Sequence, residues 1–588
     1  MRGRSILTCT ALAAAITVSG TTTALAGNNK SGFRTTQPSM LDPTGPGVAV
    51  TPLMTVGDTL SSGYRFESIP DGISLRTRGK GRVDVFVNHE TGKVPFPFVR
   101  ANPNETNGEN DFDNSQVSRL RLNQHSAGVL GGKFVIPSSF GYQRFCSNYL
   151  ATAKEGFDRE ILFTNEESPD YVFRQENSWP PPIGDPNERE AGLVVALDVK
   201  TGKHHPIQGM GRHNHENSVP IPGYGKPVVL SGDDTFTSGS LAAAGDEPEQ
   251  PAQSQLYSYI APNTKSLLAD KGDMWAFVST TPGVKDYYDV LPGSPTPVTG
   301  HFIKVPRNIA TGLNPDGSEL RSDDVGYPPP PNNGTWQTDL RSIAPVGIDG
   351  PQWVLQHWSD KNDVFQFVRV EDIAYDKRPG MGNVVYIADS GRGRTGLGPE
   401  GGQPFRSTNG RVWKMVLDPN DPKTVTSLTV LVEGDDSVVK SPGEIHQPDN
   451  VESTRNGLLL TEDPGSSQQY PAVPPPGPVD PDRTTARLMH ASFASPALPT
   501  EVARVNQTAD GGPTDVDGRP PGNWGAWESS GIVDASKAFG PDMFLIDIQA
   551  HTLWIEKAPG DDNYAPLGPD FTYKREGGQL LLMRIPGA

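Results

Sequence analysis

Several short apolar segments of the chain end in side chains that bind hard metal ions. Carboxylate and amide oxygens suit calcium, which takes about six to eight oxygen ligands, and they also suit ferric or manganous ions. A single acid at the end of a strand is often only a turn residue. Five segments of the same form favour a shared site, and these are "VFVNHE", "LFTNEE", "VVLSGDD", "YIADS" and "LLTED".

The candidate ligands are spread over most of the chain. If they converge, cations must accompany them, because clustered carboxylates repel one another and their pKa values rise. They are Glu90, Glu166, Glu167, Glu216, Asp233, Asp234, Glu371, Asp372, Asp449, Asn450, Glu462 and Asp463.

Cys146 is the only cysteine expected in the mature chain, since Cys9 lies in a predicted leader. A lone thiol is often a small buried hydrophobe. In an exported protein it can instead be a metal ligand, because coordination deprotonates the sulfur. Residues 1–26 read as a secretory signal, with Arg2 and Arg4, an apolar run at 6–18 and "ALA" at 24–26. We therefore expect a secreted protein, cleaved near Ala26.

The composition excludes several function classes. A formal net charge of −18 argues against nucleic-acid binding, and no later stretch is long and apolar enough to predict a membrane span. The chain lacks a G-x-S-x-G elbow, a P-loop and an H-E-x-x-H pair. Nothing in the sequence demands more than a monomer.

The rest of the chain predicts an all-β protein. Runs of four to eight apolar residues alternate with turns, as in "AGLVVALDVKTGK" and "NVVYIADSG", and long helical periodicity is nearly absent. We expect a β-propeller with additional strands, short helices and long Pro/Gly-rich loops, although no strict blade repeat is visible. An extended segment would cover residues 27–50 and a single propeller domain residues 51–588. Loops are expected at 27–50, 169–190 and 464–485, with an insertion at 237–254.

An ordered series of motifs resembles the PhoX family of secreted bacterial alkaline phosphatases. The series contains "NHE" (88–90), Cys146, "NEE" (165–167), "HEN" (215–217), "GDD" (232–234), "VRVEDIAYD" (368–376), "QPDNVE" (447–452) with "LLLTED" (458–463), and "WESSG…GPDMFLIDIQAHT" (527–552). The family's Arg-Pro-Glu-Asp is Arg-Val-Glu-Asp here. The resemblance spans roughly residues 50–555. It implies a propeller whose channel holds iron and calcium (Fe3+ and Ca2+). It also implies an enzyme that hydrolyses phosphate esters at these metals.

The resemblance also implies roles for individual residues. Cys146 would be the thiolate ligand, Glu216 would bridge metals, and Glu371 would be a catalytic metal ligand. Arg369 would bind the substrate phosphate, and the two-residue spacing in a strand would put it on the same face as Glu371. Further metal ligands, mostly to calcium, would be Glu90, Glu167, Asp233 or Asp234, and Asp449, with Asn450 and Asp463 as weaker candidates.

Two other readings stay open. The chain could be a calcium-dependent propeller hydrolase of another class, phytase-like or lactonase-like, which would need no iron. It could also be a non-enzymatic, calcium-stabilised surface binding module.

Overall fold

A computed structural model describes residues 31–91, 115–168, 171–172, 189–235, 252–329, 349–391, 409–434, 444–463, 484–509, 527–556 and 571–588, apart from 68, 292, 293, 295 and 508. The expected signal segment and most of the expected loops lie outside these residues. Residues 31–588 form one compact unit. Among the described residues, no helix combines the length and apolarity needed to cross a bilayer.

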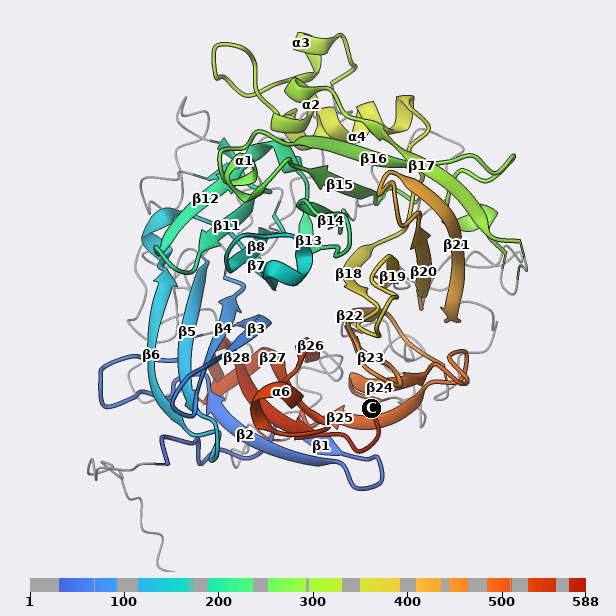
Figure 1. Ribbon diagram of the computed structural model, residues 1–588. Helices are drawn as coiled ribbons and strands as arrows, with labels where there is room; N and C mark the ends of the chain where they lie inside the picture. The colour runs from blue at the N-terminus through green and yellow to red at the C-terminus, as the bar shows by residue number, and fades with distance from the viewer. Residues whose placement is uncertain are drawn as a thin grey trace, which may run out of the picture. The chain divides into compact units, whose positions relative to one another are not determined.

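The fold is a β-propeller, as the sequence predicts (Figure 1). The first blade pairs neighbouring strands in chain order: β3 (Pro70–Arg78), β4 (Arg82–His89), β5 (Gln116–Asn123) and β6 (Val129–Ile136). The second blade is β7 (Phe145–Ala151), β8 (Ile161–Glu166), β11 (Val194–Asp198) and β12 (Lys203–Ile207), beside a small sheet of β9 (Tyr171–Val172) and β10 (Arg189–Glu190).

A nine-stranded sheet supplies two further antiparallel groups, which are joined edge to edge where β17 pairs with β21. The first group is β13 (His215–Pro220), β14 (Val228–Asp233), β15 (Leu256–Ile260), β16 (Asp273–Ser279) and β17 (Val298–Lys304). The second group is β18 (Val370–Tyr375), β19 (Val384–Asp389), β20 (Arg411–Leu417) and β21 (Thr424–Glu433).

N-terminal strands complete the last two blades. One consists of β22 (Pro448–Ser453), β23 (Gly457–Glu462), β24 (Arg487–Ser492), β25 (Thr500–Val505) and β1 (Leu41–Pro43). The other consists of β26 (Glu528–Asp534), β27 (Met543–Glu556), β28 (Phe571–Arg584) and β2 (Ala49–Thr55). The described part of 27–50 therefore contains β1 and the start of β2, which tie the first part of the chain to the last.

Helices are short, as expected, and they are α1 (Thr264–Leu268), α2 (Arg307–Thr311), α3 (Ser322–Val325), α4 (Pro351–Lys361) and α6 (Ser536–Phe539). Apolar side chains form separate cores around the blades, such as the cluster containing Phe277, Phe365 and Trp413. The innermost strands also carry buried polar residues, such as Asp71 and Glu216.

The six innermost strands contact one another in a closed ring, in the order β3, β7, β13, β18, β22 and β26 (Figure 1). Two glycines allow neighbouring strands to approach closely. A Cβ on Gly72 would lie 2.3 Å from the backbone nitrogen of Asn148, and a Cβ on Gly531 would lie 2.6 Å from the carbonyl oxygen of Asp71. These positions therefore need glycine for steric reasons.

Candidate metal centre

The same irregularity recurs near the start of every innermost strand. The pairing with the second strand of the blade shifts between Pro70 and Ile73, Phe145 and Asn148, His215 and Ser218, Val370 and Ile373, and Pro448 and Val451, and in β26 between Ser530 and Ile532. A β-bulge of this kind bends the strand and re-aims its side chains. The bulges therefore place equivalent residues of all six strands at one level of the ring.

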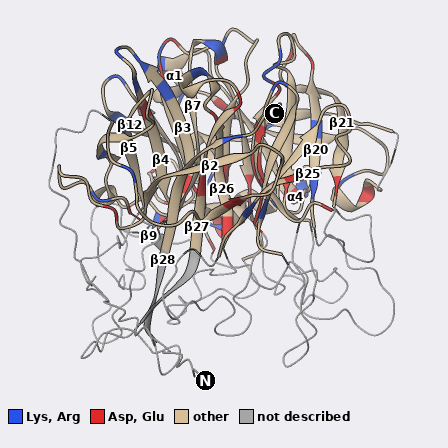
Figure 2. Ribbon diagram, turned by 90° about the horizontal axis from the view of Figure 1, so that it is seen from below, with Lys and Arg blue, Asp and Glu red and all other residues tan. Residues whose placement is uncertain are grey.

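The first residue of each bulge lies at this level, and five of the six are potential metal ligands. In chain order from β3 to β26 the six residues are Asp71, Cys146, Glu216, Glu371, Asp449 and Ser530. The Sγ of Cys146 donates to the Oε1 of Glu216 over 2.8 Å. Ligand atoms lie within 4.8 Å of one another in each of three overlapping groups, which are Asp71, Glu90 and Cys146; Cys146, Glu167 and Glu216; and Glu216, Glu371 and Asp449. Together the three groups contain seven different residues, which we call the acidic ring. Acidic residues, red in Figure 2, occur within the strand layer as well as at its edges.

The paired acids at the ends of the second strands divide into two roles. In "NEE", Glu166 accepts backbone hydrogen bonds from Gln143 (2.8 Å) and Leu193 (3.0 Å), so it fixes neighbouring chain segments. Glu462 accepts in the same way from the backbone nitrogens of His446 (2.9 Å) and Arg487 (3.0 Å). The next residue in each pair, such as Glu167, turns toward the charged groups of the channel.

Arg369 precedes β18 and is held by three acids. Its Nε and Nη2 donate to the two carboxylate oxygens of Asp234 at 2.8 and 2.7 Å. Nη2 is also 2.9 Å from the Oε1 of Glu371, and Nη1 is 4.0 Å from the Oδ2 of Asp463. Arg369 and Glu371 therefore meet, as the strand spacing predicts.

Arg144 occupies the position before β7 that Arg369 occupies before β18. Its Nη2 lies 3.2 Å from the Oε1 of Glu90 and 3.8 Å from the Oε2 of Glu167. Its φ of 44° is unusual for a residue with a side chain. Two guanidinium groups thus stand beside the acidic ring, and each lies two residues before one of its members.

Burial dominates the electrostatics of the acidic ring. It raises the pKa of Glu216 well above the ordinary value, and Glu167 and Glu371 raise it further. Burial likewise raises the pKa of Asp449, with Glu371 and Glu216 adding to the effect. For Glu371 the increase caused by burial is opposed by Arg369. The ring without cations therefore cannot ionise fully near neutral pH.

The pKa values of Asp71 and Cys146 are raised as well. Burial raises the pKa of Asp71 to about 7, and the charge of Glu90 contributes. Burial also raises the pKa of the Cys146 thiol, followed by repulsion from Asp71 and Glu216. A bound cation would reverse these shifts, because its charge favours the deprotonated ligands.

The donor set fits a mixed metal cluster. The groups that contain Cys146 combine sulfur with carboxylate oxygens, which suits a transition metal such as iron. Glu216, Glu371 and Asp449 offer only oxygen, which suits calcium. Glu216 belongs to both kinds of group, so it is the residue best placed to bridge two metals.

The remaining predicted ligands are placed as follows. Asp234 and Asp463 surround Arg369. Asn450 follows Asp449 in the bulge of β22, and its Nδ2 donates to the Oγ of Ser147 (3.0 Å). Asp233 is not brought into the three groups; it accepts from the Oγ1 of Thr235 (2.6 Å) and lies 3.7 Å from the Nδ1 of His213.

Sequence reasoning missed two residues of the site, Asp71 and Arg144. Each had a visible signal. The Pro-Asp at 70–71 repeats the Pro-Asp at 448–449, and "RFC" at 144–146 has the same spacing of arginine and ligand as "RVE" at 369–371. The common bulge explains why those short patterns repeat when blade length does not.

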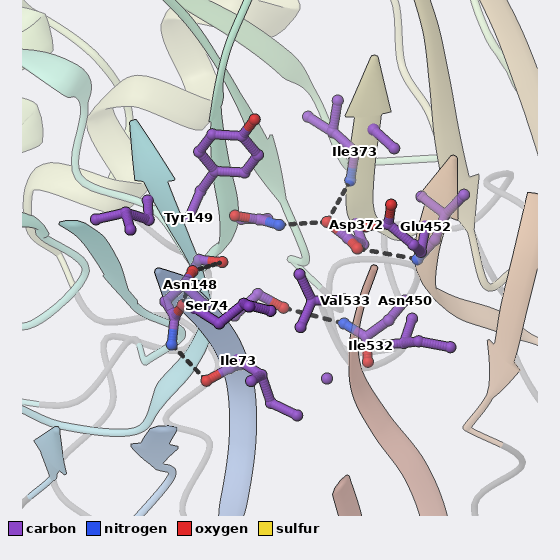
Figure 3. A pocket seen from close by; sticks show the side chains of 18 of the residues that line it. Ile73, Ser74, Asn148, Tyr149, Asp372, Ile373, Asn450, Glu452, Ile532 and Val533 are labelled. Atoms are coloured by element: carbon purple, nitrogen blue, oxygen red, sulfur yellow. Dashed lines mark hydrogen bonds between the residues drawn. The ribbon is translucent and has the colours of Figure 1, made fainter. Parts of the chain in front are cut away.

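A pocket of about 130 Å³ lies on the other side of the bulges (Figure 3). Its lining includes Asn148, Asn217, Asp372 and Glu452, with Ile73, Ile373 and Ile532. Asp372 accepts from the Nδ2 of Asn217 and from the backbone nitrogen of Val451 (Figure 3). We call this space the amide pocket.

No model of a known protein family and no curated protein matches the chain. Among solved structures, a protein of unknown function from Dyadobacter fermentans is 12% identical, with a TM-score of 0.37, and covers 92% of this chain and 100% of its own. An acylaminoacyl peptidase from Pyrococcus horikoshii is 9% identical, with a TM-score of 0.20, and covers 85% of this chain and 60% of its own. Similarity at this level carries no argument about function.

Proposed function

We propose that the protein is a secreted, metal-dependent phosphohydrolase that cleaves phosphate esters at the acidic ring. One observation carries the proposal: Arg369 contacts Glu371, which shares a group of potential metal ligands with Glu216 and Asp449. A cation cluster and a guanidinium side by side are what phosphoryl transfer needs, because catalysis there consists mainly of positioning and charge neutralisation. The sequence resemblance to PhoX supports the same reaction class.

Cys146, Glu90, Glu167 and Glu216 would hold iron, and Glu216, Glu371 and Asp449 would hold calcium. Metals in such a cluster neutralise phosphate charge and lower the pKa of a bound water. The sulfur donor distinguishes this proposal from a calcium-only hydrolase, since calcium selects oxygen ligands.

The two arginines have a positioning task. The guanidinium of Arg369 would bring a fixed positive charge and the N–H groups of its Nη1 to a substrate phosphate. Asp234 and Glu371 hold its Nε and Nη2, so its orientation is fixed by the fold before substrate arrives. Arg144, held by Glu90 and Glu167, approaches the same ring from the second blade and would bind a further anionic oxygen.

The test measures phosphate release from an aryl phosphate monoester and from the matching diester by the natively purified protein. Activity should disappear after strong chelation and return when iron and calcium are supplied together. Recovery with calcium alone would instead favour a calcium-dependent hydrolase. If no phosphate ester is turned over by protein that contains both metals, the proposal is wrong.

A further inference from the structure

Asp547 in β27 is a buried acid outside the acidic ring. Its side chain is 0% exposed, and neither carboxylate oxygen has a hydrogen-bond partner among the described residues. The Oδ2 of Asp71 and the Oε1 of Gln549 are also buried without a partner there. Four such oxygens are unusual, because a buried polar atom without a partner costs free energy of folding.

These oxygens come from strands that meet at one place. Asp547 lies directly opposite Ser530 in the pairing of β26 with β27, so both side chains are on the same face. Gln549 is two residues further along β27, where its Nε2 donates to the Oγ of Ser530 (3.3 Å). The Oγ of Ser530 donates in turn to the Oδ1 of Asp71. Ser530 thus connects Asp71 of the first blade to Asp547 and Gln549 of the last.

The equivalent position in two other blades is an asparagine. Asn88 in β4 donates from its Nδ2 to the Oγ1 of Thr164 (2.8 Å) and to the carbonyl oxygens of Cys146 and Ser147. Asn165 in β8 donates to the Ser147 carbonyl oxygen over 2.8 Å. Asp547 makes no comparable contact, because neither of its oxygens has a hydrogen-bond partner among the described residues, and an ionised carboxylate cannot donate.

We propose that Asp547, Asp71 and Gln549 bind a calcium ion that joins the last blade to the first. Calcium takes several oxygen ligands from carboxylates and amide carbonyls, and these residues offer four oxygens that otherwise lack partners. The Oγ of Ser530 and water molecules would complete the coordination. The ion would lie beside the acidic ring and share Asp71 with it, but Asp547 belongs to none of the ring's three groups. This proposal does not depend on the reaction that the protein catalyses.

The test compares the wild-type protein with Asp547→Asn, which keeps the shape of the side chain and restores the residue of the first two blades. Bound calcium per chain is measured by elemental analysis, and the calcium-induced rise in Tm by calorimetry, with magnesium alone as control. We expect the variant to bind one calcium ion fewer and to show a rise in Tm at most half that of the wild type. Iron content should be unchanged.

Equal calcium stoichiometry and an equal rise in Tm in both proteins would overturn the proposal. If Asp547→Asn does not fold, Gln549→Met decides by the same two measurements, since it removes one ligand oxygen at nearly constant volume. In this variant the calcium concentration that gives half of the rise in Tm should be at least tenfold higher than in the wild type. An unchanged dependence in Gln549→Met would equally overturn the proposal.

Discussion

The two sides of the bulges are built from the same six strands but differ in the partners of their acids. In the acidic ring, carboxylates and a thiol face one another, and burial and mutual repulsion raise their pKa values. In the amide pocket burial also raises the pKa values, to about 6 for Asp372 and about 7 for Glu452. Each of these acids nevertheless has its own partner, because Asp372 accepts from Asn217 and two backbone nitrogens and Glu452 pairs with Lys377. Acids that lack compensation within the chain indicate a site for an external cation, whereas compensated acids indicate structure.

The largest effect should come from Glu216→Gln, because Glu216 belongs to two of the three ligand groups. Loss of a bridging ligand removes several kcal/mol of metal-dependent stabilisation, so phosphate release should fall by about a thousandfold. Metal content, measured by elemental analysis, should fall with it. The matched control is Glu452→Gln in the amide pocket, which should retain its metals and activity within about threefold. Equal losses of metal and activity in both variants would contradict the distinction between the acidic ring and the amide pocket.

A second comparison uses the two ends of β18. Arg369 lies before the strand beside the acidic ring, and Arg378 lies beyond its other end, paired with Asp376. Arg369→Lys should lower kcat/KM by about a hundredfold, because a lysine cannot reproduce the bidentate contact with Asp234 that orients the positive charge. Arg378→Lys should change it little. If the Arg369 variant were as active as the Arg378 variant, Arg369 would have only a structural role.

Arg144→Lys should have a smaller effect than Arg369→Lys. Arg144 contacts Glu90 and Glu167 through one nitrogen, and the latter contact is 3.8 Å long. A loss of about tenfold in kcat/KM is expected for one weaker charged contact, mainly through KM. A change in Tm without any change in KM would assign Arg144 to structure alone.

The last prediction concerns the pH dependence of the stability of the metal-free chain. Burial raises the folded-state pKa of Asp71 to about 7, whereas an unfolded aspartate titrates near 3.8. The folded chain therefore holds a proton that the unfolded chain has released, and the free energy of unfolding falls as pH rises through this window. Each unit of such a shift corresponds to about 1.4 kcal/mol. Thermal unfolding of chelated protein should thus give a lower Tm at pH 8 than at pH 5, and bound metals should reduce the difference. Equal Tm values for the chelated protein would contradict the account of the ring.

The sequence predicts the fold class from its strand pattern, Glu90 and Glu167 from the acids that end strands, and Cys146 as a lone thiol. Glu216, Glu371 and Asp449 lie in bulges near the starts of strands, and the motifs that resemble PhoX predict them. The sequence does not separate the two members of each acid pair. Glu166 and Glu167 look alike in "NEE", yet Glu166 accepts backbone hydrogen bonds and Glu167 joins a ligand group. Which one turns inward depends on strand register. Asp71 was missed for a related reason, since its place at the axis follows from a bulge rather than from any regular alternation.

Elemental analysis of natively purified protein, together with its visible spectrum, tests the central claim most directly. The account predicts iron and calcium bound in stoichiometric amounts, with a charge-transfer band from the Cys146 thiolate that disappears in Cys146→Ser. The matched substitution Ser147→Ala, at the next residue of the same bulge, should leave the band in place. A fully active protein that contains no transition metal and has no such band would contradict the account.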